Sequence, residues 1–500
     1  MPEIKVLIPS KLSIEELILK NPISFKPYKK DHLAYIISLL YHIQATNPEL
    51  QLKNGYWPIN AEILQDVVGN YNKYLDYLVG KVFETNNWFN VQKHQSRGYR
   101  FTRQFLYDKG IVFTITDWTT IKAIKRQEQK IRNLQSYNHL EKWFNTKLRI
   151  DAVIANEFIE TELERILNDK DLYKKMEQKK KNIFTQYNSA KLHISRIATN
   201  DYKPSVDRRV FRFHSPITNL RGTIRNCLTY GNKKLVAVDI KNSQPYFSVI
   251  LFNTEFWGVS TPHNPYDKGN LRLLKISKNL YKELKPRIRE YILTLTLQES
   301  AESQYSIALQ LYIESVRDGT LYKDLTDALN FPDYSKSLKN INAERYRTKR
   351  KEPTKRIRKV ADKQRIISEK ETKKNFLVIL NGNNKYFTDT KLIFEGGWPI
   401  VARLFNRIKK EDHSTLGIIL QQIESYLVLK IVCKRIAKEK PNLPIFTIHD
   451  SVVTTVGHEG YVEKVIIEEL ENAIGIPPTC KREYWGPENL KFSDDTPFLH

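Results

Sequence analysis

Two stretches with the hydrophobic pattern of buried strands stand far apart in the chain, and each carries an aspartate where its apolar run stops. Residues 235–240 read Leu-Val-Ala-Val-Asp-Ile, and residues 446–455 read Phe-Thr-Ile-His-Asp-Ser-Val-Val-Thr-Thr. Runs rich in β-branched residues are typical of buried strands, and His449-Asp450-Ser451 between two such runs predicts a tight β-hairpin with a polar tip. We therefore expect Asp239 and Asp450 at neighbouring strand ends. The alternative is that each is an ordinary cap or turn residue.

A helical pattern covers residues 370–381 and is closed by Gly382. At about 100° per residue, offsets of four and eleven return Lys374 and Asn381 to within roughly 40° of Lys370. One face of this predicted helix therefore carries two cations and an amide. Such a face suits an incoming triphosphate, because lysine offers a point charge to phosphate oxygens. An ordinary solvated helix face has the same pattern.

Hydrophobic periodicity also predicts elements over much of the remaining chain. Helices are expected over residues 32–44, 61–68, 71–80, 119–147, 156–188, 279–294, 303–318, 321–329, 416–439 and 460–473, and strands over residues 82–91 and 98–102. The helices at 119–147 and 156–188 are expected to be long and antiparallel, with the run Lys179-Lys180-Lys181 towards one end.

The predicted elements between residues 31 and 115 follow the order helix, turn, helix and basic hairpin. This order is that of a winged-helix module, in which one helix enters the major groove of DNA. Arg97, Arg100 and Arg103 would then contact phosphate groups from the wing. A small α/β packing domain is the alternative.

Cations are dense in two further segments. Residues 208–225, directly before Asp239, include Arg212, Arg221 and Arg225. Residues 345–365 surround Pro353 with cations, either as a loop that becomes ordered on nucleic acid or as a linker. A run of like charge is also compatible with a solvated face.

The net charge agrees with a polyanionic partner. The 500 residues carry a formal net charge of +25, with 27 Tyr and 22 Phe, which makes nucleic acid the simplest candidate. Cys227, Cys433 and Cys480 are too widely spaced to indicate a disulfide framework or a zinc site. With no apolar stretch of roughly 18 residues and no signal-peptide pattern, we expect a cytoplasmic protein without membrane contact.

Two aspartates at neighbouring strand ends are what two-metal phosphoryl transfer requires. Paired Mg²⁺ ions roughly 3.5 to 4 Å apart activate the attacking oxygen and stabilise the leaving pyrophosphate. Mg²⁺ prefers oxygen ligands. We therefore expect Asp239, Asp450 and the backbone carbonyl of Ile240 to hold two Mg²⁺ ions, for which Mn²⁺ can substitute.

In their order along the chain, these segments resemble the superfamily that joins family A DNA polymerases with single-subunit, phage-type RNA polymerases. Asp239 matches the aspartate of the first palm motif, and His449-Asp450-Ser451 matches the His-Asp motif of the palm. Lys370-x3-Lys374-x6-Asn381-Gly382 matches the fingers-helix pattern Arg-x3-Lys-x6-Tyr-Gly, and Gln421-Gln422-Ile423-Glu424-Ser425 is similar to the Gln-bearing palm helix. The resemblance covers roughly residues 205 to 485.

The resemblance implies an α+β right-hand polymerase fold of palm, fingers and thumb, preceded by the winged-helix-like module. The expected segments are an irregular arm (1–30), a winged-helix-like DNA-binding domain (31–115), a helical thumb-like region (116–203), the first part of the palm (204–253), fingers (254–410) and the second part of the palm (411–500).

The resemblance also implies roles for single residues. Lys374 would neutralise the triphosphate and protonate the pyrophosphate. Arg212, Arg221 and Arg225 lie where the related polymerases place template- and primer-contacting arginines, and would contact phosphates. From the sequence itself, Pro245 would fix the start of a helix that aims Asn242 and Gln244 at the nucleotide sugar or the template. Gln422 and His449 would contact the primer end. For His449, a core histidine bound to backbone is the alternative.

Several positions depart from the DNA polymerases. The Glu and Tyr that screen out the 2′-hydroxyl are replaced by Gln244 and Asn381, and an asparagine leaves room and can hydrogen-bond a hydroxyl. Ser451 is more similar to the RNA polymerases, and Lys370 lacks the bidentate fork of arginine. These departures favour tolerance of ribonucleotides.

The sequence thus predicts a template-directed nucleotidyltransferase that uses a DNA template, a primer or product strand and nucleoside triphosphates. A small polymerase joined to a DNA-binding module suits replication or priming of a mobile element. The alternative is a non-catalytic replication initiator that binds DNA on a polymerase-like scaffold. A third possibility is template-independent tailing.

Overall fold

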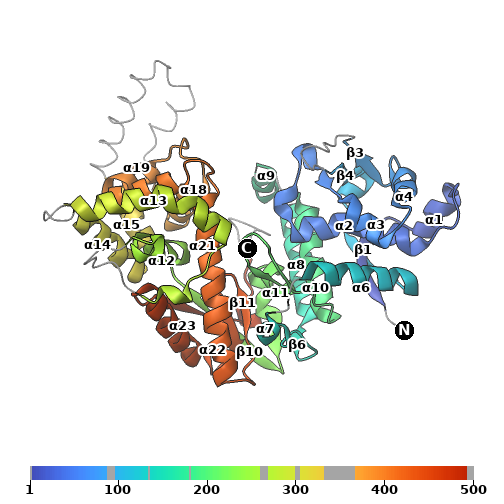
Figure 1. The fold of residues 1–500 in the computed structure, drawn as a ribbon. Helices are drawn as coiled ribbons and strands as arrows, with labels where there is room; N and C mark the ends of the chain where they lie inside the picture. The colour runs from blue at the N-terminus through green and yellow to red at the C-terminus, as the bar shows by residue number, and fades with distance from the viewer. Residues whose placement is uncertain are drawn as a thin grey trace, which may run out of the picture.

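The chain folds around two hydrophobic cores. A computed structural model describes residues 3–86, 96–132, 134, 136–178, 182–259, 269–298, 304–331 and 366–492. One core is built from buried residues between Ile4 and Ile124, joined by Leu192, and the other from buried residues between Leu134 and Trp485. Figure 1 shows the corresponding N-terminal and C-terminal parts on opposite sides of helices α8 (Ala152–Asn168) and α10 (Ile183–Ala198). The first core therefore extends past the expected boundary at residue 115.

The N-terminal part holds two small sheets and a set of short helices. Strand β1 (Ile4–Pro9) pairs antiparallel with β5 (Gly110–Ile115), and β2 (Trp57–Pro58), β4 (Gly98–Phe101) and β3 (Phe83–Thr85) form a sheet in the order β2-β4-β3. The helices are α1 (Ile14–Lys20), α2 (Lys30–Thr46), α3 (Ala61–Val67), α4 (Tyr71–Leu78) and α5 (Arg103–Leu106). Helices α2, α3 and α4 lie within two residues of the expected bounds.

The expectation of two long antiparallel helices over 119–147 and 156–188 is wrong. The region instead contains α6 (Trp118–Arg132), α7 (Asn138–Glu141), β6 (Leu148–Ile150), α8, α9 (Lys170–Gln178) and α10. Strand β6 joins the second core through buried Leu148 and Ile150, and Asp151 starts α8 by accepting a hydrogen bond from the backbone of Ile154. Asn182 caps α10 in the same way. The run Lys179-Lys180-Lys181 lies outside the described residues.

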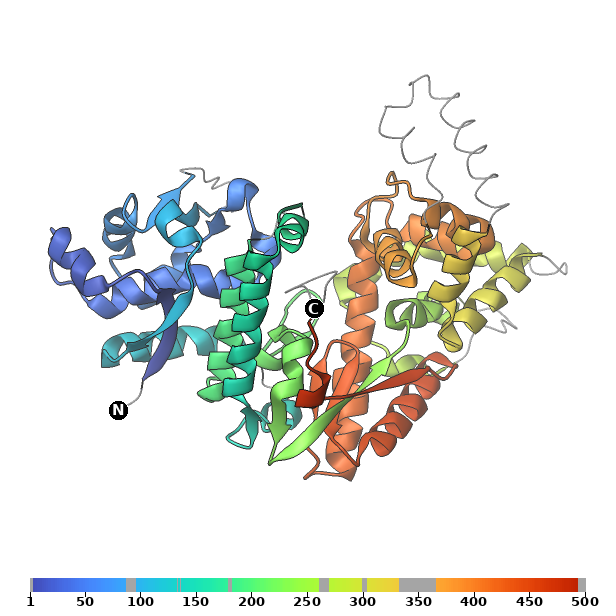
Figure 2. The ribbon, with the colours of Figure 1, turned by 180° about the vertical axis from the view of Figure 1, so that it is seen from behind.

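A central sheet organises the second core. Its main path is β11 (Phe446–Ile448), β12 (Ser451–Thr455), β10 (Lys233–Ile240), β9 (Leu228–Tyr230) and β6, and β13 (Cys480–Tyr484) also pairs with β10. Figure 2 shows this sheet from behind. All these neighbours are antiparallel, and Val238 pairs with Val452. The register therefore brings the end of β10 next to the β11–β12 turn.

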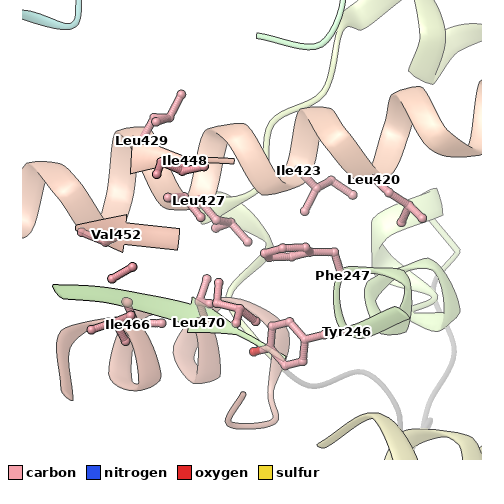
Figure 3. Packing of buried hydrophobic residues seen from close by; sticks show 14 of the residues in the cluster. Tyr246, Phe247, Leu420, Ile423, Leu427, Leu429, Ile448, Val452, Ile466 and Leu470 are labelled. Atoms are coloured by element: carbon pink, nitrogen blue, oxygen red, sulfur yellow. The ribbon is translucent and has the colours of Figure 1, made fainter. Parts of the chain in front are cut away.

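Helices cover the central sheet. A nearly continuous helix consists of α21 (Thr415–Tyr426), a π-helical turn η7 (Leu427–Val432) and α22 (Cys433–Glu439), and α23 (Glu459–Ile474) and α12 (Ser243–Ser248) pack nearby. Figure 3 shows Phe247 of α12 directed towards Ile423 and Leu427, and Tyr246 towards Leu470. The helical stretch 415–439 is long and apolar enough to span a membrane, since an 18-residue window within it has a mean hydropathy of 1.5. However, 72% of that window is buried inside the protein, as in the core helix of a soluble protein.

A helical layer lies at the far end of α21 from α22 (Figure 1). It comprises α13 (Lys278–Gln298), α14 (Gln304–Arg317), α15 (Leu321–Asn330), α18 (Glu369–Asn381), α19 (Asp389–Gly397) and α20 (Pro399–Ile408). Helix α18 starts where Ser368 accepts a hydrogen bond from the backbone of Glu371, one residue before the expected start. The basic segment 345–365 lies outside the described residues. Two short strands, β7 (Ser205–Val206) and β8 (Phe213–His214), and helix α11 (Pro216–Asn219) precede β9.

Candidate active site

Asp239 and Asp450 converge at one end of the central sheet. Asp239 lies on β10, and the β11–β12 turn consists of His449 and Asp450, with His449 in the left-handed region at a φ of 55°. The hydroxyl of Ser451, next to Asp450 in the chain, donates a hydrogen bond to the Asp239 carboxylate. The tight turn and the strand register thus bring the two acids together from positions far apart in sequence.

The charge environment of Asp450 reflects this convergence. Its pKa is raised to about 7, first by burial and then by the nearby carboxylates of Glu424 and Asp239, whereas a hydrogen bond from Ser243 acts in the opposite direction. An aspartate surrounded by other carboxylates favours its protonated form unless a cation is present. The site is therefore poised to bind positive charge.

Glu424 is the carboxylate that the sequence analysis missed. It lies on α21 with a side-chain exposure of only 2%, and the Arg212 guanidinium donates to its Oε1 at 2.8 Å. The Gln244 amide donates to the other oxygen of the same carboxylate. Burial raises the pKa of Glu424, and Arg212 and Gln244 partly offset this effect. The sequence did offer one sign of it, because Glu424 is an acidic residue inside an otherwise mostly apolar helix.

Asn242 and Gln244 flank the start of α12. Asn242 has a φ of 52°, and among the described residues its buried Nδ2 has no hydrogen-bond partner. The amide nitrogen of Gln244 is used by Glu424, so its orientation is fixed by α21. Asn242 and Gln244 stand three and five residues after Asp239 in the chain.

Helix α18 presents its cationic residues to solvent. Lys370, Lys374 and Asn381 are exposed, and within the described part of the chain neither lysine forms an ion pair. Tyr322 of α15 connects this helix with the acids. Its ring lies 5.8 Å from the Nζ of Lys373 and 5.6 Å from the ring of Phe376, while Asp450 adds to the rise in its pKa that burial causes.

Asn381 ends α18 beside a glycine of α21. Its Nδ2 donates to the Leu377 carbonyl at 3.1 Å, and a Cβ added to Gly417 would lie 1.9 Å from its Oδ1. The absence of a side chain at Gly417 therefore makes room for the Asn381 amide.

Lys409 holds the C-terminal end of α18. Its buried Nζ donates to the carbonyls of Ile379 at 2.5 Å and Gly382 at 3.1 Å, which are among the carbonyls a helix end leaves unpaired. Burial, assisted by the charge of Lys391, lowers its pKa to about 8.

We expect Lys409→Met to lower the free energy of unfolding by about 1 to 3 kcal/mol, because two buried carbonyls lose a charged donor while the apolar stem is retained. Urea denaturation measures this change. Lys410→Met removes a neighbouring exposed lysine and should change the free energy by less than about 0.5 kcal/mol. Equal effects of the two variants would contradict the capping role.

The three arginines expected to contact phosphate have partners within the protein. Arg212 is bound to Glu424, and Arg221 forms an ion pair at 2.8 Å with Glu162, whose exposure is 2%. Arg225 donates to the carbonyls of Leu220 and Thr218, and burial lowers its pKa to about 10. These guanidinium groups bind partners inside the protein instead of lying free on its surface.

Gln422 and His449 differ in their availability to a primer. The amide of Gln422 is buried, accepts from the backbone of Ser277 at 2.8 Å and donates to the carbonyl of Arg209 at 2.7 Å, so its expected primer contact is not supported. His449 keeps solvent exposure at the turn. Desolvation of its ring, followed by the charges of Arg212, His214 and Arg225, lowers the pKa of His449 to about 4, so it is neutral at pH 7.

The three arginines expected to contact phosphate from the N-terminal part differ in how freely they can do so. Arg100 is bound to Glu84 at 2.6 Å and stacks 4.6 Å from the Tyr56 ring, which leaves it little freedom to contact phosphate. Arg103 is exposed, and Arg97 interacts with Tyr99. Most of the loop expected between the strands at 82–91 and 98–102 lies outside the described residues.

The donor set fits Mg²⁺. Among the described residues, no group of three or more His, Cys, Asp or Glu is arranged to hold a metal ion. A site shared with substrate needs fewer protein ligands, because Mg²⁺ keeps several waters and is commonly bound by one or two carboxylates plus phosphates. Asp239, Asp450 and the Ile240 carbonyl are oxygen donors of that kind. Glu424 is engaged by Arg212 and Gln244 and is not counted among the ligands.

No protein-family model matches the chain, and no curated protein matches it. Among solved structures, it is similar to the POL domain of Pol1 from M. smegmatis in complex with DNA primer-template and dNTP, with 12% sequence identity, a TM-score of 0.28 and 74% of each chain covered. A TM-score this low does not assign a function, which has to be argued from the side chains of the protein itself.

Proposed function

We propose that this protein is a template-directed nucleic-acid polymerase that transfers nucleotides with two Mg²⁺ ions. The observation that supports this most directly is the convergence of Asp239 and Asp450, with Ser451 bridging their segments and Glu424 adding negative charge. A second support is that Tyr322, whose pKa Asp450 helps to raise, also contacts α18 at Lys373.

Each residue has a role in the proposed reaction. The 3′-hydroxyl of a primer or first nucleotide gives its proton to a solvent water and attacks the α-phosphate, so that a new P–O bond forms and the bond to pyrophosphate breaks. Asp239, Asp450 and the Ile240 carbonyl would hold the ions, which when bound activate the attacking oxygen and stabilise the leaving group. Lys374 neutralises the triphosphate and donates a proton to pyrophosphate, and Lys370 adds a second charge.

The arrangement suits a right-hand polymerase with an N-terminal DNA-binding module. The central sheet would be the palm, the layer that contains α18 the fingers, and α8 to α10 the thumb. In the N-terminal part, the element order α2, β2, α3, α4, β3, β4 and the sheet order β2-β4-β3 support a winged-helix-like module. A polymerase joined to such a module suits replication or priming of a mobile element on a DNA template.

The test is extension of a labelled primer on a DNA template with Mg²⁺ and either dNTPs or NTPs. Extension that follows the template sequence is the expected result. A protein that binds DNA but extends nothing with either nucleotide set would be a non-catalytic initiator, and extension of single strands regardless of sequence would indicate tailing.

We expect Asn381→Ala and Gly417→Ala to change the ratio of NTP to dNTP incorporation in the same direction. The first removes the amide that is proposed to face the sugar, and the second displaces it, because a Cβ at position 417 overlaps its Oδ1. Replacing a glycine inside a helix by alanine stabilises the helix by about 0.5 to 1 kcal/mol, so Gly417→Ala should remain folded. Incorporation ratios measured in competition are the readout.

A matched control is Asn383→Ala, an exposed asparagine just beyond the helix end. It should leave the ratio unchanged. If neither Asn381→Ala nor Gly417→Ala alters the ratio, Asn381 has no part in sugar selection.

A further inference from the structure

A basic cavity lies at the end of the central sheet opposite the two aspartates. A cavity of about 740 Å³ is lined by the residues before and within β6, the β9–β10 turn, the segment between α22 and β11, and the end of β12. Lys233 starts β10 and lines this cavity, whereas Asp239 lies six residues further along the same strand. At roughly 3.3 Å per residue the two are about 20 Å apart, so the cavity is separate from the acids.

The lining is cationic and contains no carboxylate. Lys147, Arg149, Lys233 and Lys440 contribute four positive charges, and neither Asp nor Glu is among the lining residues. All four are exposed, and none forms an ion pair with another described residue. The next residue on β10 behaves differently, since Lys234 pairs with Glu488 at 2.6 Å. Four unneutralised cations around one cavity repel one another, and an anionic ligand would relieve this repulsion.

The walls of the cavity are held by contacts that leave these cations available. Lys142 donates to the Pro441 carbonyl at 2.8 Å and so positions the segment after α22. The backbone of Gly231 donates to the Lys147 carbonyl at 2.8 Å, which ties the β9–β10 turn to the segment before β6. Lys440 lies 3.9 Å from the centre of the Tyr461 ring, which restrains its ammonium group.

We propose that this cavity binds phosphate groups, supplied by a nucleic-acid single strand or by a free nucleotide. Lysine offers point charges and arginine a fork to phosphate oxygens. The volume lies within the range of roughly 300 to 1,000 Å³ that small-ligand sites occupy. Thr146, Asn232 and His458 add uncharged polar groups to the lining. The site needs no metal and does not depend on the reaction at Asp239 and Asp450.

The test compares two double variants that remove the same charge. Lys147→Ser/Lys233→Ser removes two of the four cationic side chains that line the cavity. The control Lys434→Ser/Lys438→Ser removes two exposed lysines of α22 that do not line it. Binding of fluorescein-labelled oligothymidylate and of fluorescent ATP is measured by anisotropy over a range of salt concentrations, with EDTA present so that metal at the acids cannot contribute.

We expect the cavity variant to bind its ligand about ten-fold more weakly than the control variant at low salt. For the single strand, the slope of log K against log salt should also fall by about 1.4, since each phosphate contact contributes about 0.7. Weakening of both probes identifies the shared phosphate chemistry of nucleotides, and weakening of the strand alone identifies a strand site.

Equal binding by the cavity and control variants, for both probes, would overturn the proposal. Thermal unfolding followed by circular dichroism checks that each variant is folded. If the first cavity variant fails to fold, Arg149→Ser/Lys440→Ser removes the other two cations and is judged by the same comparison.

Discussion

Asp450→Asn should reduce template-directed extension by about a thousand-fold or more while DNA binding stays within about two-fold of the unmodified protein. The amide keeps the size of the side chain but removes the charge that holds metal beside Asp239. Metal ions supply several kcal/mol of transition-state stabilisation, and each 1.36 kcal/mol is a factor of ten in rate. Single-turnover primer extension and anisotropy with the same primed template measure the two quantities.

Asp327→Asn is the matched control, because Asp327 is an exposed acid on α15. It should leave extension unchanged. Asp239→Asn should behave like Asp450→Asn, since the two carboxylates act as one site. Retention of extension in either of these two variants would remove the basis of the proposed mechanism.

Arg212→Leu should lower the free energy of unfolding by about 3 to 5 kcal/mol near pH 8. Among the described residues, it leaves the buried Glu424 carboxylate with Gln244 as its remaining hydrogen-bond donor, and breaking a buried ion pair by removing one partner has effects of this size. Adding Glu424→Gln should recover most of the loss, because the uncompensated charge is then absent. Urea denaturation of the single and double variants provides the measurement.

The pH dependence of Arg212→Leu has a definite sign. Burial already holds the pKa of Glu424 above its ordinary value, and loss of Arg212, which lowers that pKa, raises it further. A carboxyl with a raised pKa in the folded state stabilises the fold below its unfolded pKa, near 4.5, and loses this contribution as pH rises through the folded pKa. The defect of Arg212→Leu should therefore shrink towards pH 4.5. Arg208→Leu, at an exposed position, should show neither the defect nor the pH dependence.

The elements that carry a strong local pattern were predicted well. The β-hairpin at 446–455, the strand that contains Asp239 and the helix ending at Asn381 lie where alternation, β-branched runs and a closing glycine indicated. The helices at 279–294, 303–318 and 321–329 are also confirmed: α13 is longer by one residue at its start and four at its end, α14 is shorter by one residue at each end, and α15 is longer by one residue at its end. In these segments, local preference and burial favour the same structure.

The sequence did not reveal features that depend on distant partners. Strand β6 is three residues long and lies between the two helices expected at 119–147 and 156–188, and it is a strand only because β9 lies beside it. Strand β13 reads Cys-Lys-Arg-Glu-Tyr, with little apolar signal, and owes its conformation to pairing with β10. The internal partners of Arg221, Arg225 and Gln422 likewise come from segments that no local pattern connects to them.

The π-helical turn η7 constrains the number of residues between Glu424 and Arg435. A π turn contains one residue more than an α turn, which rotates all later side chains by about 100°. Upstream of it, Glu424 meets Arg212, and downstream of it, Arg435 meets Glu468 and Glu469 of α23 at 2.6 and 2.9 Å. Deleting one residue between Glu424 and Arg435 would turn one of these partners away from its counterpart. The spacing of these two residues is thus as constrained as their identity, and insertions or deletions here should be tolerated less than most substitutions.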